Sequence, residues 1–356
     1  MSLPYEKFNV AAVQAAPYQM NTPATVDKAC KLITDASASD VRLIVFPELF
    51  VPGYPNVVPM RSGDEPSIPL TSEGESWLDY WADFTRTAVQ VPGPETDLLG
   101  EAAAKADAYV VVGVNERDEE FGPGTAVFNT AVLIGPDGGY IGKHRKLVPT
   151  FHEQLYHSRG DGSDLKVFDT IVGKLGMTIC YEHLQPLMKY SYFAMGEQIH
   201  CAVWPGCPDA PLSIRHIVDA ASRQYAIEGG VFVVVASQVG PPDPHAADHR
   251  YASGWKYFGG SGIINPLGLY LEGPLYDKEG ILVAEIDPRE IGRAKAIVDI
   301  TGINSRPDVF SLSVRTDHAP LIRKIGAEAA PPQETSPHTK PSEKEPPRRE
   351  ESSHAE

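Results

Sequence analysis

Three short segments of the chain combine an apolar run with a residue that can react, exchange a proton or carry charge. In the first, LIVFPELFVPGYP, Glu48 follows the apolar run Leu43–Phe46 and Pro47. A carboxylate that follows a buried strand lies at the edge of a sheet, where α/β proteins place their sites. Partial burial there raises the pKa of the carboxyl group, which suits a general base. For this segment alone, a solvent-exposed glutamate in a turn is an equal alternative.

The second segment, KHRKLVPT, places four basic or histidine residues in a row, from Lys143 to Lys146, in a chain that is otherwise acidic. One inward-pointing lysine would stabilise an anion that develops during a reaction. A charged surface loop or an anion-binding patch is the simpler interpretation of this segment alone.

The third segment, LGMTICYEH, ends an apolar strand at Cys180, and Pro186 soon begins a helix. Such a strand–turn–helix corner exposes a side chain and leaves backbone N–H groups free for an oxyanion hole. It is also a place where the pKa of a thiol is lowered. A small buried core cysteine is the alternative.

Together, a carboxylate base, a cationic group and a thiol nucleophile suffice for acyl-type transfer from carbon–nitrogen substrates, with no metal and no cofactor. Metal and nucleotide motifs are weaker, because no histidine pair stands in an H-E-x-x-H sequence, no second cysteine pair is present and no glycine loop is complete. The candidate residues for such motifs are His152/His157, His245/His249, Cys201/Cys207, Gly122–Gly124 and Gly260–Gly262.

Alternating helices and buried strands must position these segments. The apolar patterns predict strands at 9–14, 43–46, 109–114, 128–134, 140–143, 174–180, 201–204, 231–237, 262–264 and 282–286. They predict helices at 25–36, 95–107, 186–196 and 213–228. The turn sequences PDGG and NPLG mark two hairpins. The sequence therefore predicts an α/β layer fold with a mixed sheet.

Composition changes only near the end of the chain, so we expect one large domain over residues 1–315 and an extension over 316–356. From about residue 326 the extension is rich in Pro, Glu, Ser and Lys and has no aromatic residue. Such a segment cannot bury enough apolar surface to offset its ordering entropy, and we expect it to be disordered. It is either a passive tail or a partner-docking segment.

The formal net charge of the 356-residue chain is −16. This charge argues against nucleic acid and anionic membranes as partners. No apolar run reaches the roughly 18 residues of a membrane span, and the N-terminus lacks the pattern of a signal peptide. The four cysteines, Cys30, Cys180, Cys201 and Cys207, are too few for a disulfide framework. We expect a protein of the reducing cytoplasm.

The three motifs, in this order, resemble the nitrilase superfamily and within it the true nitrilase branch. FPELFVPGYP around Glu48, HRKLVPT around Lys146 and ICYEH around Cys180 are similar to that branch's catalytic motifs. IHCAVWPG and SRPDVFSL are similar to two further branch signatures, and the resemblance covers nearly all of residues 8–312.

The resemblance implies a four-layer α-β-β-α sandwich and a Glu-Lys-Cys triad. It assigns Glu48 as general base, Lys146 as electrostatic stabiliser and Cys180 as nucleophile, with Lys143 as the competing lysine. Glu153 is similar to a second family glutamate that holds the catalytic lysine and helps to position the attacking group.

One residue departs from the branch pattern, because Tyr181 follows the nucleophile where the branch usually has Trp. The Tyr181 N–H still serves an oxyanion hole, but its hydroxyl needs a partner, so the change puts the substrate range in doubt. The expected substrate pocket, for which core packing is an equal alternative, comprises Tyr54, Tyr181, His183, Trp204 and Pro205.

The implied reaction is hydrolysis of a nitrile, with water, to a carboxylic acid and ammonia through a covalent thioimidate and thioester. Release of an amide, and an amidase, carbamoylase or cyanide-hydrolysing activity on the same triad, are alternatives. A non-catalytic assembly protein is the alternative from another class. The resemblance also implies homo-oligomers, from dimers to larger spirals.

Overall fold

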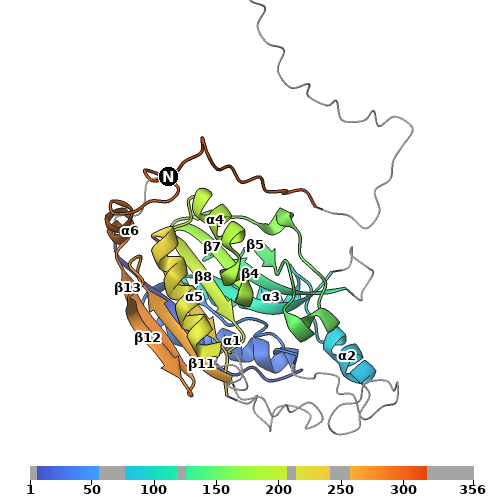
Figure 1. Ribbon diagram of the computed structural model, residues 1–356. Helices are drawn as coiled ribbons and strands as arrows, with labels where there is room; N and C mark the ends of the chain where they lie inside the picture. Colours follow the sequence, from blue (N-terminus) through green and yellow to red (C-terminus); the bar gives the residue numbers. More distant parts are fainter. Residues whose placement is uncertain (1–5, 56–76, 119–125, 207–213, 241–256, 319–356) are drawn as a thin grey trace, which may run out of the picture. The chain divides into compact units, whose positions relative to one another are not determined.

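The computed structural model describes residues 6–55, 77–118, 126–206, 214–240 and 257–318. Their strands form two sheets (Figure 1). The first has the order β13 (Gly280–Ile286), β1 (Phe8–Gln14), β2 (Val41–Val45), β3 (Tyr109–Arg117), β4 (Val127–Ile134), β5 (Tyr140–Arg145). The second has the order β10 (Val239–Gly240), β11 (Tyr257–Ile264), β9 (Phe232–Ser237), β8 (Ile199–Trp204), β7 (Gly173–Ile179), β6 (Phe168–Thr170), and β12 (Tyr270–Tyr276) pairs with β11.

The described α-helices are α1 (Thr22–Ser37), α2 (Trp77–Arg86), α3 (Pro94–Ala106), α4 (Pro186–Ala194), α5 (Ile214–Gly229) and α6 (Arg289–Lys295). Short 3₁₀ helices span Phe151–Leu155, Gly162–Asp164 and Cys180–Leu184. Asn21 begins α1, since its side chain accepts a hydrogen bond from the N–H of Ala24 at 3.2 Å, and a proline opens both α3 and α4.

Alternation along the strands separates two cores. Val10 and Ala12 of β1 pack with Met177 of β7 between the sheets, whereas Ala11 and Val13 pack against α1 and α3. Helices α4 and α5 cover the far face of the second sheet, with Phe193 and Tyr225 packed against it. The layers are therefore helices, sheet, sheet, helices, and the predicted α-β-β-α sandwich is confirmed.

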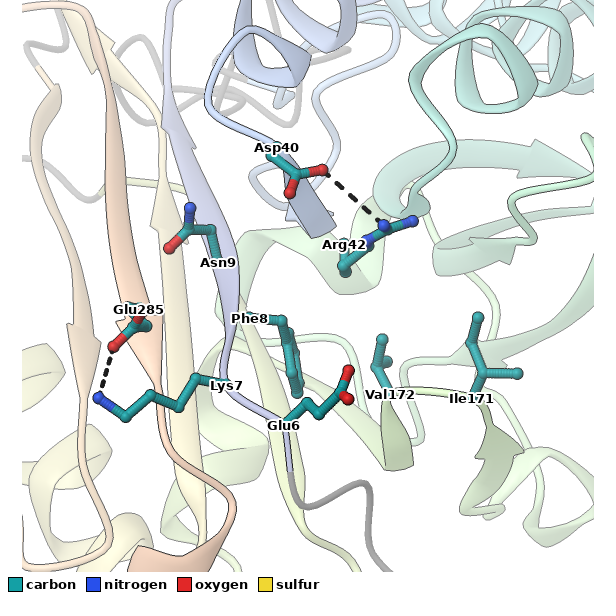
Figure 2. Close-up of a pocket in the computed structure, with 9 residues that line it drawn as sticks. All are labelled: Glu6, Lys7, Phe8, Asn9, Asp40, Arg42, Ile171, Val172 and Glu285. Atoms are coloured by element: carbon teal, nitrogen blue, oxygen red, sulfur yellow. Dashed lines mark hydrogen bonds and ion pairs between the residues drawn. The ribbon is translucent and has the colours of Figure 1, made fainter.

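Parallel strands bring the chemical segments to one end of the sandwich. Strands β1, β2 and β3 are parallel, as are β7, β8 and β9. Glu48 and Cys180 follow the carboxyl ends of β2 and β7. At the amino ends of β1, β2 and β7 lies a separate hollow of about 510 Å³, where Lys7 pairs with Glu285 at 2.8 Å and Arg42 lies 3.8 Å from Asp40 (Figure 2).

The predicted strands and helices within the described residues are present, with ends that differ by a few residues. The PDGG sequence joins β4 to β5, and NPLG joins β11 to β12, where Gly268 (φ +77°) donates its N–H to Asn265 O at 2.9 Å. Helices α2 and α6 and strands β6, β10 and β12 were not predicted from the sequence. Strand β12 lies at an edge of its sheet and contains the Gly273-Pro274 pair. Because proline interrupts the residue pattern of a strand, the sequence did not indicate this strand.

Several predictions concern residues outside the described ranges. These are the tail from residue 326, Gly122–Gly124, Cys207, His245, His249 and the first residue of the predicted helix 213–228. Among the residues that are described, no helix is long and apolar enough to cross a membrane, and no three acidic, histidine or cysteine side chains are grouped to hold a metal ion.

Candidate active site

The turn after β2 fixes the backbone of Glu48 between the two sheets. The N–H of Glu48 donates to the carbonyl oxygen of Trp204 at 3.3 Å, and Gln238 Nε2 donates to the carbonyl oxygen of Glu48 at 2.7 Å. Leu49, the next residue, has a left-handed φ of +47°, a conformation that costs energy in a residue with a side chain. The side chain of Glu48 is completely buried.

Lys146 lies between two carboxylates. Its Nζ is 2.8 Å from Oε1 of Glu48 and 2.8 Å from each carboxylate oxygen of Glu153. The side chains of all three are at most 1% exposed, so these are buried charges that hold one another. Lys143 instead pairs with Glu116 of β3, away from Glu48.

Further donors hold the two carboxylates. Glu153 lies in the 3₁₀ helix Phe151–Leu155, and its Oε1 accepts the hydroxyl of Tyr54 at 2.5 Å. The side-chain amide of Asn129, on β4, donates to Oε1 of Glu48 at 2.6 Å and lies 3.4 Å from Oε2 of Glu153. The N–H of Thr150 also donates to Glu153, at 3.2 Å. Lys146 and Asn129 contact both carboxylates, so Tyr54 and Thr150 are two donors that Glu153 has in addition.

The two carboxyl groups consequently have different pKa values. Burial raises the pKa of Glu48 to about 7, and the charge of Glu153 adds to this, against the opposing effects of Lys146 and Asn129. Burial acts on Glu153 in the same direction, but Lys146, His157 and the Tyr54 hydroxyl hold its pKa below the usual value. Carboxyl groups whose environments separate their pKa values are suited to different roles.

The ammonium of Lys146 is strongly held in its charged form. Burial alone would lower its pKa, but Glu153, Glu48 and the thiolate form of Cys180 raise it well above the usual value. Burial raises the pKa of Tyr54, and the charges of Glu153, Glu48 and the same thiolate add to this effect. Cys180 therefore lies within electrostatic reach of the Lys146 group.

Cys180 stands in a strained turn between β7 and the 3₁₀ helix Cys180–Leu184. Its φ is +55°, it is 2% exposed and it forms no disulfide. Glu182 holds this turn, because its carboxylate accepts the N–H groups of Ile179 and Leu147, each at 2.8 Å, and lies 2.8 Å from Nε2 of His144. One carboxylate thus ties the cysteine turn to the chain that carries Lys146.

The five predicted pocket residues lie in different surroundings. Tyr54 contacts Glu153, and Tyr181 lines a groove of about 1010 Å³ together with Thr150 and Phe151. Trp204 and His183 are buried and stack at 4.8 Å between ring centroids. Pro205 is buried directly after Trp204.

Three residues of this site were not predicted from the sequence. Asn129 and Gln238 bind Glu48, and Glu182 holds the cysteine turn. The signal for Asn129 was an amide within the fully buried apolar strand VFNTAVLI, since a buried polar group needs a partner.

Residues 9–296 match the carbon-nitrogen hydrolase family. The chain therefore belongs to the carbon-nitrogen hydrolase family. It is 36% identical over 321 residues to Nitrilase 3 of Arabidopsis thaliana, covering 87% of this chain and 88% of that protein. It is 37% identical over 320 residues to the aliphatic nitrilase of Rhodococcus rhodochrous, covering 87% and 83%. These relatives place it in the nitrilase branch.

A third relative, the bifunctional nitrilase/nitrile hydratase NIT4A of Lupinus angustifolius, is 37% identical and covers 86% of this chain and 85% of that protein. Solved structures share the fold at lower identity. The NitFhit protein of C. elegans has a TM-score of 0.67 at 18% identity and covers 90% of this chain and 69% of that one. Nit3 of Saccharomyces cerevisiae has a TM-score of 0.65 at 22% identity and covers 85% and 99%.

Proposed function

We propose that this carbon-nitrogen hydrolase is a nitrilase, which converts an organic nitrile and two water molecules to a carboxylic acid and ammonia. The observation that carries the proposal is the buried contact of Lys146 with the carboxylates of Glu48 and Glu153, at the strand ends where Cys180 stands. The chain is also similar to nitrilases over most of its length. In this proposal Cys180 is the nucleophile, Glu48 the general base and Lys146 the electrostatic stabiliser.

The first half of the reaction uses the difference between the two carboxyl groups. Glu48, with the raised pKa, takes the thiol proton of Cys180, while Glu153 stays ionised and holds Lys146. The thiolate attacks the nitrile carbon, and a C–S bond forms as one C–N π bond breaks. Lys146 and the N–H of Tyr181 stabilise the charge on nitrogen, which takes the proton from Glu48 to give a thioimidate and leaves Glu48 ionised again.

In the second half, Glu48 removes a proton from a water molecule that attacks the thioimidate carbon. The tetrahedral intermediate expels ammonia and leaves a thioester. A second water attacks the thioester, and the acid leaves as the thiol of Cys180 is restored. If the tetrahedral intermediate expels the thiol first, the product is an amide instead.

The groove beside Tyr181 supports an apolar organic substrate. Leu147, Phe151 and Leu187 line it with Tyr181, and the exposed surface of the groove is mainly apolar. Tyr54, His183, Trp204 and Pro205 complete the proposed substrate pocket.

A product assay tests this function. Wild-type protein and Cys180→Ala are incubated with aliphatic, aromatic and arylacetic nitriles, with cyanide and with the matching amides, and ammonia, acid and amide are quantified. We expect acid and ammonia from a nitrile with the wild type and none with Cys180→Ala. Turnover of amides alone would make the protein an amidase, and turnover by Cys180→Ala would contradict the cysteine mechanism.

We further propose a homo-oligomer in the cytoplasm. Exposed apolar side chains lie on the nucleophile turn and on helices α4 and α5, namely Leu184, Leu187 and Ile227, which supports a contact between copies. A thiol nucleophile also works in a reducing compartment. Light scattering of the wild type and of Leu187→Asp tests the contact, since we expect the variant to have a lower mass, and an unchanged mass would contradict it.

A further inference from the structure

A chain of buried polar side chains runs from the backbone of Cys180 into the layer between the second sheet and helices α4 and α5. Nδ1 of His183 lies 2.7 Å from the carbonyl oxygen of Cys180, and Nε2 of His183 lies 3.1 Å from Nε2 of His200. Nδ1 of His200 lies 2.6 Å from Oε1 of Glu197. The hydroxyl of Tyr225 donates to the other oxygen of Glu197 at 2.7 Å.

The members of this chain are shielded from water and carry out no step of the proposed reaction, in which His183 is assigned only to the wall of the substrate pocket. Relative exposure is 0% for His183, His200 and Tyr225 and 1% for Glu197. None of the four contacts Lys146. Groups of this kind are costly to bury unless they are fully hydrogen-bonded, so the arrangement needs a reason.

The carbonyl oxygen of Cys180 sets the direction of the hydrogen bonds. A carbonyl only accepts, so Nδ1 of His183 carries the hydrogen. Burial lowers the pKa of His183 to about 3, so the ring is neutral and its Nε2 must accept. His200 therefore donates from its Nε2, directly or through the hydroxyl of Thr178, which lies 3.1 and 3.0 Å from the two Nε2 atoms.

The direction of the hydrogen bonds at His200 also fixes the proton at Glu197. If His200 is neutral and donates from Nε2, its Nδ1 accepts, and the proton in the 2.6 Å contact belongs to Glu197. If His200 is charged, Glu197 is ionised. In both cases His200 and Glu197 together hold the same number of protons, which is one more than an ionised Glu197 beside a neutral His200 would hold. Burial, which raises the pKa of Glu197 to about 8, agrees with this count.

The carbonyl oxygen of Cys180 and the N–H of Tyr181 belong to one planar trans peptide, so they point in opposite directions. A hydrogen bond that fixes the carbonyl toward His183 therefore also fixes the N–H on the opposite side. Cys180 has a left-handed φ of +55°, so this peptide stands in a conformation that its neighbours must maintain.

We propose that His183, His200 and Glu197 are positioning residues that hold the Tyr181 N–H in place to stabilise the charge formed on the substrate, and that the Glu197–His200 pair retains the proton that directs the chain. The inference rests on the proposed function only for the identity of that charge.

Two matched pairs of variants test the chain. In His183→Asn the side-chain amide can still donate to the Cys180 carbonyl, whereas His183→Leu cannot. Glu197→Gln copies the protonated carboxyl group, because its amide donates to His200 and its oxygen accepts from Tyr225, whereas Glu197→Leu breaks the chain. For each variant, kcat and KM for the preferred nitrile are measured. Alkylation of Cys180 by iodoacetamide, which needs the thiolate but no oxyanion hole, is followed by mass spectrometry.

We expect each leucine variant to lower kcat by about 100-fold, the loss typical of one oxyanion donor, with KM and alkylation changed only a few-fold. His183→Asn and Glu197→Gln should recover most of kcat. Equal losses in Gln and Leu variants, wild-type kcat in His183→Leu, or a parallel loss of alkylation and kcat would overturn the proposal. A wild type that hydrolyses no nitrile would refute the function instead. Amide hydrogen exchange over residues 180–184 then tests the chain, and it must be faster in His183→Leu than in His183→Asn.

Discussion

Both carboxylate oxygens of Glu153 lie 2.8 Å from Nζ of Lys146, whereas Glu48 offers the same ammonium a single oxygen at 2.8 Å. Glu153 thus holds the lysine with two contacts, and Glu48 keeps its second oxygen, a buried atom with no partner among the described residues. One carboxylate is therefore a fixed counter-ion, and the other can take up a proton. This asymmetry underlies the predictions for the triad.

Replacing the two competing lysines separately distinguishes their roles. Lys146→Met should abolish turnover and cost about 3 to 5 kcal/mol of stability, because it leaves two buried carboxylates without a cation. Lys143→Met should keep activity within a few-fold, since Arg145 still holds Glu116 through Nε at 2.8 Å and Nη2 at 2.5 Å. Steady-state kinetics and urea unfolding check both variants. Loss of activity in Lys143→Met alone would reverse the assignment.

The Tyr54 hydroxyl should matter through Glu153. Tyr54→Phe removes the 2.5 Å hydrogen bond to that carboxylate, so Lys146 is held less firmly and kcat should fall. Hydrogen bonds to charged groups contribute about 1.5 to 3 kcal/mol, and urea unfolding should show a loss in that range. Tyr192→Phe is the matched control, because that buried hydroxyl donates to a neutral acceptor, the carbonyl of Met177, at 3.0 Å. If the two variants have equal kcat, Tyr54 has no special role.

The pH profile of kcat/KM should have an acid limb, a fall at low pH, that is set by the protonation of Glu48. The base must be ionised, and burial raises its pKa to about 7, so kcat/KM should fall as pH decreases through this value. The hydrogen bond from Asn129 favours the ionised form. Asn129→Leu should therefore move the limb to higher pH and lower kcat/KM at neutral pH.

The neighbouring residue provides the control for that shift. Thr130 follows Asn129 on β4, but its hydroxyl donates to Glu116 at 2.7 Å and not to Glu48. Thr130→Val should leave the acid limb where it is in the wild type. A limb that moves equally in both variants, or moves to lower pH in Asn129→Leu, would contradict the role of Asn129.

The sequence predicted the positions of Glu48 and Cys180 because each ends an apolar run, and parallel strands bring such ends together. It could not choose between Lys143 and Lys146 from spacing, since that choice depends on where β5 ends and on the partner of each side chain. Lys146 comes directly after β5, and its N–H continues the pairing with the carbonyl of Asn129 at 2.8 Å.

Polar residues within buried strands were the hardest to interpret. Asn129 meets Glu48 across 81 positions of sequence, and Gln238 meets it across 190. Their partners are determined by the order of the strands in the sheets, which local patterns do not contain. For the same reason His200, inside an apolar strand, gave no sign of its contact with His183, 17 positions earlier in the sequence.

Glu182 should be as important for stability as for turnover. Its ionised side chain accepts the N–H groups of Ile179 and Leu147, and His144 holds its pKa below the usual value against the effect of burial. In Glu182→Gln one oxygen becomes an NH₂ group that faces a donor, so the variant should lose about 1 to 3 kcal/mol and most of its turnover. Urea unfolding and the product assay measure both effects. Glu285→Gln is the control, because its ion pair with Lys7 is solvent-exposed and contributes little to stability. Equal stability of the two variants would show that Glu182 does not hold the cysteine turn.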